Sequence, residues 1–107
     1  MERISRGDIW TLVPVNHPKP RPALVLSINP INDLCPDILM VPFTGKSGPL
    51  RILVEESSQV SGLRQTSYAK CESVGPVHKS RLKEKIGVLS SASLAEVEKG
   101  VRRVLGL

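Results

Sequence analysis

The hydrophobic pattern of the chain changes its period near residue 90, and this change restricts the folds that the sequence can adopt. Before that point, short apolar segments alternate with turns rich in proline, glycine and asparagine, which is typical of β-strands. After it, apolar residues follow helical spacing and form one stripe of an amphipathic helix. Strands followed by one terminal helix predict an α+β, mainly β fold, a small barrel or curled antiparallel sheet with the helix packed on it. The stripe comprises Leu94, Val97, Val101, Val104 and Leu105.

The expected strands are short and end at turn-forming residues. They cover residues 8–12, 23–28, 38–43, 50–54, 67–71 and 74–77. Residues 13–20 and 29–36 are expected to be loops because proline removes a backbone donor. The basic segment 79–85 is expected to be a solvated edge. For the helix, several of the serines at 90–93 can serve as N-cap, one of them in a capping box with Glu96, and Gly106 is the expected C-cap.

Length and composition predict one globular domain, residues 1–107. Fifteen lysines and arginines against ten acidic residues give a formal net charge of +5, which favours a polyanionic partner. No segment approaches the roughly 18 apolar residues of a membrane span, and the first residues lack the apolar core of a secretory signal. Two cysteines are too few for a disulfide scaffold, so we expect a cytoplasmic protein with no membrane contact.

The first candidate for chemistry is Arg21, in the segment HPKPRP at residues 17–22. Alternating prolines hold this segment extended and restrict the backbone on either side of Arg21. A guanidinium held in this way offers a planar fork of donors to phosphate or carboxylate. Two other interpretations stay open: a solvated arginine at a loop edge, and a proline-rich ligand for a partner domain.

The second candidate is the segment VPFTGKSG at residues 41–48, where a strand stops at a hydroxyl. The glycine after Thr44 exposes backbone N–H groups, and Lys46 adds charge, a combination that binds anions. The segment lacks the earlier glycine of a phosphate-binding P-loop. An ordinary hairpin turn is the alternative interpretation.

The two histidines, His17 and His78, could act as acid and base in RNA cleavage. With Cys35 and Cys71 they also reach the number of ligands of a zinc site, but no pair has ligand spacing, so we expect no metal and no cofactor. Cys71 is expected to be a small core residue. Three aromatic residues are too few for base stacking to be the main mode of nucleic-acid binding.

Six short segments, taken in order, resemble the MazF/PemK/Kid toxins of type II toxin–antitoxin modules. They are RGDIW at residues 6–10, RPALVLS at 21–27, VPFT at 41–44, SYAKCE at 67–72, VHKSRL at 77–82 and IGVLS at 86–90. Each segment is short, but their order and spacing extend over nearly the whole chain. The resemblance implies an SH3-like β-barrel of about six to seven strands with a C-terminal helix, assembled as a homodimer.

The activity that the resemblance implies is metal-independent, sequence-specific cleavage of single-stranded RNA, usually mRNA, inhibited by a cognate antitoxin. The RNA 2′-OH attacks the adjacent phosphate and leaves a 2′,3′-cyclic phosphate and a 5′-OH. The family's catalytic arginine and threonine fall on Arg21 and Thr44. The expected RNA-binding residues are His17, Lys19, Lys46, Glu72, Ser73, His78 and Lys79.

One position departs from the family pattern. Gly75 stands where many members carry a second arginine that contributes to catalysis in some of them. Three explanations stay open: Arg21 acts without a second cation, His78 or Lys79 replaces the missing arginine, or the activity is weak.

Two other functions remain possible from the sequence. A toxin resembling the CcdB group would use the same barrel to act on DNA gyrase without cutting RNA, and fold analogy alone does not separate the two activities. A basic β-barrel that binds RNA without cleaving it is the second alternative.

Overall fold

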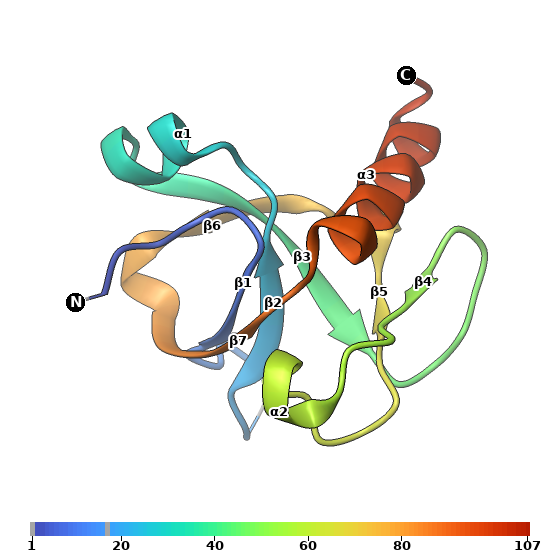
Figure 1. Cartoon of the computed structure of the whole chain (residues 1–107). Coiled ribbons are helices and arrows are strands. Elements are labelled where there is room, and N and C mark those ends of the chain that lie inside the picture. The colour runs from blue at the N-terminus through green and yellow to red at the C-terminus, as the bar shows by residue number, and fades with distance from the viewer. Residues whose placement is uncertain (1, 17) are drawn as a thin grey trace.

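The computed structural model describes residues 2–16 and 18–107 of the chain. His17, an expected RNA-binding residue, lies outside the described residues. Strands make up most of the ordered elements in this part of the chain (Figure 1). They are β1 (Asp8–Leu12), β2 (Arg21–Val25), β3 (Asp37–Thr44), β4 (Ile52–Leu53), β5 (Tyr68–Ala69), β6 (Gly75–His78) and β7 (Leu82–Val88).

Three α-helices interrupt or follow the strands. The last is the long amphipathic helix that the apolar stripe predicts, and the other two are short. Two single turns of 3-10 helix, η1 (Cys71–Ser73) and η2 (Lys79–Arg81), flank β6. The α-helices are α1 (Asn29–Leu34), α2 (Ser58–Ser61) and α3 (Ser91–Leu105).

All strand pairs are antiparallel, and the strand order is β4-β5-β3-β2-β1-β7, with β6 paired to β3. β3 organises the sheet because its first half pairs with β6, its middle with β2 and its last two residues with β5. Among the described residues, β4 and β7 at the two ends of this order do not pair with each other. The sheet is therefore open, and the closed barrel expected from the sequence is not confirmed.

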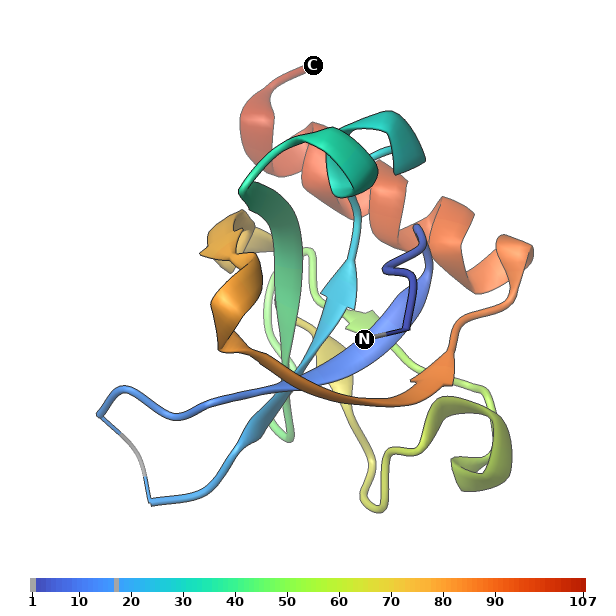
Figure 2. The ribbon, with the colours of Figure 1, turned by 90° about the vertical axis from the view of Figure 1, so that its left-hand side faces the viewer.

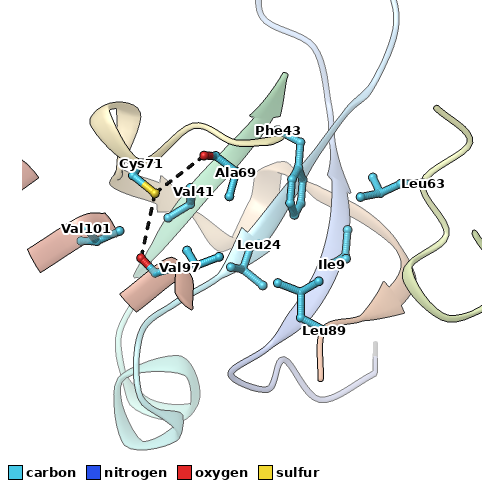
Figure 3. Packing of buried hydrophobic residues seen from close by; sticks show 10 residues of the cluster. All are labelled: Ile9, Leu24, Val41, Phe43, Leu63, Ala69, Cys71, Leu89, Val97 and Val101. Atoms are coloured by element: carbon cyan, nitrogen blue, oxygen red, sulfur yellow. Dashed lines mark hydrogen bonds between the residues drawn. The ribbon is translucent and has the colours of Figure 1, made fainter. Parts of the chain in front are cut away.

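The main hydrophobic core lies between one face of the sheet and α3. Leu24 and Val41 of neighbouring strands lie near Val97 of α3, and Ile9 of β1 belongs to the same buried cluster (Figure 3). Because side chains alternate along a strand, the residues next to them face the other way. These form a second core around Trp10, whose further buried members are Ile4, Leu12, Ala23, Val25, Ile38, Met40 and Leu82.

The terminal helix confirms the predicted change of period. The Ser90 hydroxyl accepts a hydrogen bond from the Ser93 backbone N–H at 3.2 Å, which identifies Ser90 as the N-cap, and Gly106 ends the helix in the left-handed conformation. Most of the stripe faces the core, but Leu105 in the last turn is 57% exposed. Figure 2 shows α3 lying across the molecule next to the sheet.

Residues 29–36 were expected to be a loop, and this prediction is wrong for the part that forms α1. Pro30 falls in the first turn, where the missing N–H is not needed. The side-chain amide of Asn32 is buried and donates to the Ser27 carbonyl oxygen at 2.9 Å. Proline therefore starts this short helix instead of preventing it.

Other boundaries also differ from the expected ones. Leu50 adopts a positive φ of 61°, so the strand expected at residues 50–54 shrinks to the two residues of β4. The expected strand at residues 23–28 ends at Val25, because the next two N–H groups both donate to the Leu39 carbonyl oxygen. The basic segment 79–85 contains η2 and the start of β7, an edge strand whose Lys83 and Glu84 are exposed.

Within the described ranges, no helix is both long and apolar enough to cross a membrane.

Candidate active site

Arg21 and Thr44 line the same open cleft, which has a volume of about 560 Å³. Arg21 is the first residue of β2, where it pairs with Leu12 of β1. Thr44 is the last residue of β3, where it pairs with Tyr68 of β5. The sheet thus brings the two loops that the sequence singled out to one hollow on the surface.

The floor of the cleft is apolar and its rim is charged. Phe43, Leu63 and Ile86 line it from three different elements, and the first two are buried members of the main core (Figure 3). The charged groups along the cleft are three cations and one carboxylate among the described residues: Lys19, Arg21, Arg64 and Glu84. This balance favours an anionic ligand.

The Thr44 hydroxyl is half-buried and accepts a hydrogen bond from the Lys46 backbone N–H at 3.3 Å. This local turn orients the hydroxyl at the end of the strand. Lys46 itself is exposed and is not among the cleft residues, although it lies two positions from Thr44.

An ion pair closes the loop that follows Thr44. The Arg51 guanidinium donates to Glu72 Oε2 from Nε at 2.9 Å and from Nη2 at 2.6 Å, while Nη1 donates to the Lys46 carbonyl oxygen at 3.0 Å. The hydrogen bond from Arg51 holds the pKa of the Glu72 carboxyl below its ordinary value, and the same contact raises the pKa of Arg51. The pair therefore stays charged and links η1 to this loop.

The remaining residues expected at the site lie apart from the cleft. Ser73 belongs to η1 and donates its backbone N–H to the Lys70 carbonyl oxygen at 2.9 Å. His78 Nδ1 accepts from the Ser80 backbone N–H at 3.1 Å and caps η2. The Lys79 backbone N–H donates to the Pro36 carbonyl oxygen at 3.0 Å. Of the expected RNA-binding residues that the structure describes, only Lys19 lines the cleft with Arg21 and Thr44.

Two charged cleft residues were not anticipated from the sequence, Arg64 and Glu84. Arg64 lies in the loop between α2 and β5, and Glu84 lies on β7 next to Thr11 of β1. No motif marks either residue, since both reach the cleft only through the pairing of β7 with β1 and the packing of α2 against β7.

The cysteines take no part in the cleft. Cys71 is fully buried in the main core, as predicted, and burial raises the pKa of its thiol. Cys35 is a free, partly exposed thiol in the turn after α1. In the part of the chain that the structure describes, no group of three or more histidine, cysteine, aspartate or glutamate side chains is arranged to hold a metal ion.

Comparison with known proteins places the chain in a family. The model of the PemK-like, MazF-like toxins of type II toxin–antitoxin systems matches residues 5–105. The chain belongs to this family, in agreement with the resemblance seen in the sequence.

Solved structures share the fold at low sequence identity. A mycobacterial endoribonuclease in complex with its cognate antitoxin is 20% identical, with a TM-score of 0.81 and coverage of 100% of this chain and 97% of that chain. A MazE–MazF structure from Deinococcus radiodurans is 22% identical, with a TM-score of 0.81 and coverage of 100% and 99%. The Mycobacterium tuberculosis toxin MazF-mt6 is 19% identical, with a TM-score of 0.77 and coverage of 94% and 97%. At these identities the likeness supports the fold.

Proposed function

We propose that this chain is the toxin of a type II toxin–antitoxin system and a metal-independent endoribonuclease that cleaves single-stranded RNA, mRNA above all, at specific sequences. The observation that carries the proposal is the meeting of Arg21 and Thr44 in one cleft, although they lie on different strands. Membership of the family and the endoribonuclease named in a structure of the same fold support the same activity.

The reaction needs no group beyond the substrate and the protein. The 2′-oxygen of the RNA attacks the adjacent phosphorus, the bond to the 5′-oxygen breaks, and the products are a 2′,3′-cyclic phosphate and a 5′-OH. The 2′-OH gives its proton to solvent water, and the leaving 5′-oxygen takes one proton from the protein or from water. In the transition state the phosphorane carries extra negative charge, so preorganised donors lower the barrier.

Arg21 and Thr44 divide these tasks. The Arg21 guanidinium supplies charge-assisted donors to the phosphate oxygens and is proposed as the proton donor to the leaving oxygen. The Thr44 hydroxyl hydrogen-bonds a phosphate oxygen or orients the 2′-OH, since an ordinary hydroxyl is a poor base. Lys19 on the same rim adds a contact to the RNA backbone.

The expected RNA contacts outside the cleft remain part of the proposal in a different role. Lys46, Ser73, His78 and Lys79 are proposed to contact the RNA beyond the cleaved bond, outside the cleft. Glu72 would act through its ion pair with Arg51, which holds the loop after Thr44. His17 stands two positions before Lys19 in the sequence and is proposed as a further RNA contact.

We infer the partners of the chain from its net positive charge and from its family. We propose a cytoplasmic, single-domain toxin that forms a homodimer. We also propose that the sheet of each chain forms an SH3-like barrel. A cognate antitoxin with an acidic segment would compete with RNA for the basic cleft, consistent with the net charge of +5. Such a complex is expected to form faster at low salt.

A cleavage assay in EDTA tests the activity. The purified protein is incubated with a long unstructured transcript, and the products are mapped by their 5′ ends and tested for cyclic phosphate. Wild type is expected to cut at a recurrent sequence, and Arg21→Ala is expected to lose about 10²–10³-fold in rate. Arg103→Ala, which removes an exposed arginine on α3, is the matched control and should cut like wild type.

Two results would contradict the proposal. Poisoning of DNA gyrase with no RNA cut would assign the chain to the gyrase-directed toxins. Binding of RNA without cleavage, together with growth inhibition that survives both Arg21→Ala and Thr44→Ala, would make it an RNA-binding module.

A further inference from the structure

The loop between α2 and β5, residues 62–67, carries a cation into the cleft from a part of the chain that no motif marks. Arg64 lies in this loop and lines the cleft together with Lys19, Arg21 and Thr44. This loop is distant in the sequence from the connection between β1 and β2 that leads to Arg21. Arg64 therefore reaches the cleft independently of Arg21.

The backbone that presents Arg64 is firmly held. Leu63, the residue before it, is only 8% exposed and packs in the main core with Ile9 and Phe43 (Figure 3). The Leu63 N–H donates to the hydroxyl of buried Ser61 at 3.1 Å. Gly62 ends α2 in the left-handed conformation, so close to β7 that a Cβ atom there would lie 2.2 Å from the Ile86 carbonyl oxygen. A fixed backbone of this kind reduces the entropy lost when the Arg64 side chain binds a ligand.

The guanidinium of Arg64 is also available. Its residue is exposed, and no group among residues 2–16 and 18–107 forms a hydrogen bond or an ion pair with its side chain. In contrast, Arg3, Arg6 and Arg51 are paired with Asp33, Glu98 and Glu72. An unpaired guanidinium at a cleft with an excess of cations keeps its full set of donors for a planar anion.

We propose that Arg64 is a second phosphate-binding residue of the cleft, which binds the backbone of single-stranded RNA together with Arg21. This inference rests on the proposed endoribonuclease function and assigns a residue to it. A single guanidinium balances only part of the charge on a phosphorane, and a second one in the same cleft adds donors without a metal ion. Many family members carry a second arginine at the position where this chain has Gly75, which has no side chain. Arg64 would supply a second cation in its place.

The test separates binding from cleavage. The probe for binding is the sequence that wild type cuts, synthesised with 2′-fluoro in place of 2′-OH so that the attack is impossible. The logarithm of its affinity is measured against the logarithm of the salt concentration. Loss of one phosphate contact should reduce the slope by about 0.7 for single-stranded nucleic acid, and Arg64→Ala is expected to show this change. Arg64→Lys should keep the slope, because it keeps the charge.

Cleavage of the unmodified RNA gives the second readout. Arg64→Ala is expected to lower kcat/KM by about 10²-fold or more, the range found for removal of one preorganised donor. Arg64→Lys should recover only part of this rate, because an ammonium group lacks the planar fork. The control Arg103→Ala makes the same chemical change on α3 and should leave slope and rate as in wild type. Because Arg64 is exposed, urea unfolding should confirm that all variants keep the wild-type fold.

Three results would overturn the proposal. If Arg64→Ala shows the slope and rate of Arg103→Ala while wild type still cuts RNA, Arg64 has no role and the proposed function stands. If Arg64→Ala weakens only the complex with an acidic antitoxin segment, Arg64 is a contact for the inhibitor. If wild type cuts no RNA and does not bind the 2′-fluoro probe, the proposed function itself fails and this inference fails with it.

Discussion

Gly87 of β7 lies against Ser61 of α2 so closely that a Cβ atom on Gly87 would be 2.3 Å from the Ser61 carbonyl carbon and oxygen. Together with Gly62, which touches the backbone of Ile86, this contact seats α2 directly on β7. The loop that carries Arg64 begins where α2 ends. A contact between two backbones therefore fixes the start of the loop that lines the cleft with Arg64.

We expect Gly87→Ala to destabilise the protein by about 1–3 kcal/mol, the usual cost of overpacking, because backbone atoms on both sides leave no room for a methyl group. Urea unfolding measures the loss. Gly75→Ala is the matched control, since its new methyl group would meet nothing nearer than the Ser73 carbonyl oxygen at 3.9 Å. Equal stability of the two variants would contradict the close seating of α2.

Thr44 is expected to act through its hydroxyl and not through its shape. Thr44→Val keeps the volume and removes the donor, so we expect a loss of about 10²–10³-fold in cleavage rate. Thr44→Ser keeps the hydroxyl and should keep most of the rate. Single-turnover cleavage of one defined RNA measures both variants, and a Val variant as active as the Ser variant would exclude the hydroxyl from the reaction.

Glu84 is the carboxylate among the described cleft residues, and it should repel the RNA backbone. Glu84→Gln removes this charge and is expected to tighten binding of the 2′-fluoro probe by about 0.2–1 kcal/mol, which is up to about fivefold. The effect should shrink as salt is added. Glu96→Gln, an exposed change on α3, is the control. Weaker binding by Glu84→Gln would mean that the carboxylate receives a hydrogen bond from the RNA.

The ion pair between Arg51 and Glu72 predicts a pH-dependent difference in stability. The folded state lowers the pKa of Glu72, so the stability gained from the pair is present above the ordinary value of 4.5 and is lost as the pH falls through the lowered value. Wild type should therefore exceed Glu72→Gln in free energy of unfolding at pH 7, and this gap should close as the solution becomes more acidic than pH 4.5.

The control for this prediction is a double-mutant cycle. In the Arg51→Gln background the largest cause of the lowered Glu72 pKa is gone and only the backbone hydrogen bond and Lys70 still lower it, so the gap caused by Glu72→Gln at pH 7 should be clearly smaller. Chemical denaturation at several pH values measures the four proteins. A gap that persists undiminished in the Arg51→Gln background would assign the effect of Glu72 to another group.

Local sequence chemistry predicts much of the fold. Alternating strand residues and helical spacing after residue 90 are properties of neighbouring residues, so the main strands and α3 lie close to their expected places. The errors occur where tertiary contacts outweigh local preference. α1 forms around buried Asn32 with Pro30 in its first turn, and β7 forms where it pairs with β1.

The sequence also predicted only part of the candidate site. The sequence singled out Arg21 before the expected second strand and Thr44 after the expected third, because the chemistry of both segments favours anions and the family resemblance falls on the same two residues. The structure brings them to one cleft. Most of the other expected RNA contacts carry the right chemistry but lie elsewhere, since residues close in sequence to a site need not face it. Glu72 and His78 are engaged with Arg51 and Ser80.

The amino-acid sequence by itself determined the strand-to-helix order, the basic charge and the two segments whose chemistry favours anions, because these depend on residue types and short spacings. Only the tertiary structure decided that Arg64 and Glu84 join Arg21 at one cleft. Their placement depends on the antiparallel register of β7 with β1 and on two glycines that let α2 touch β7. Contacts between segments so distant along the chain leave no periodic signal, since they are set by which backbones can approach each other.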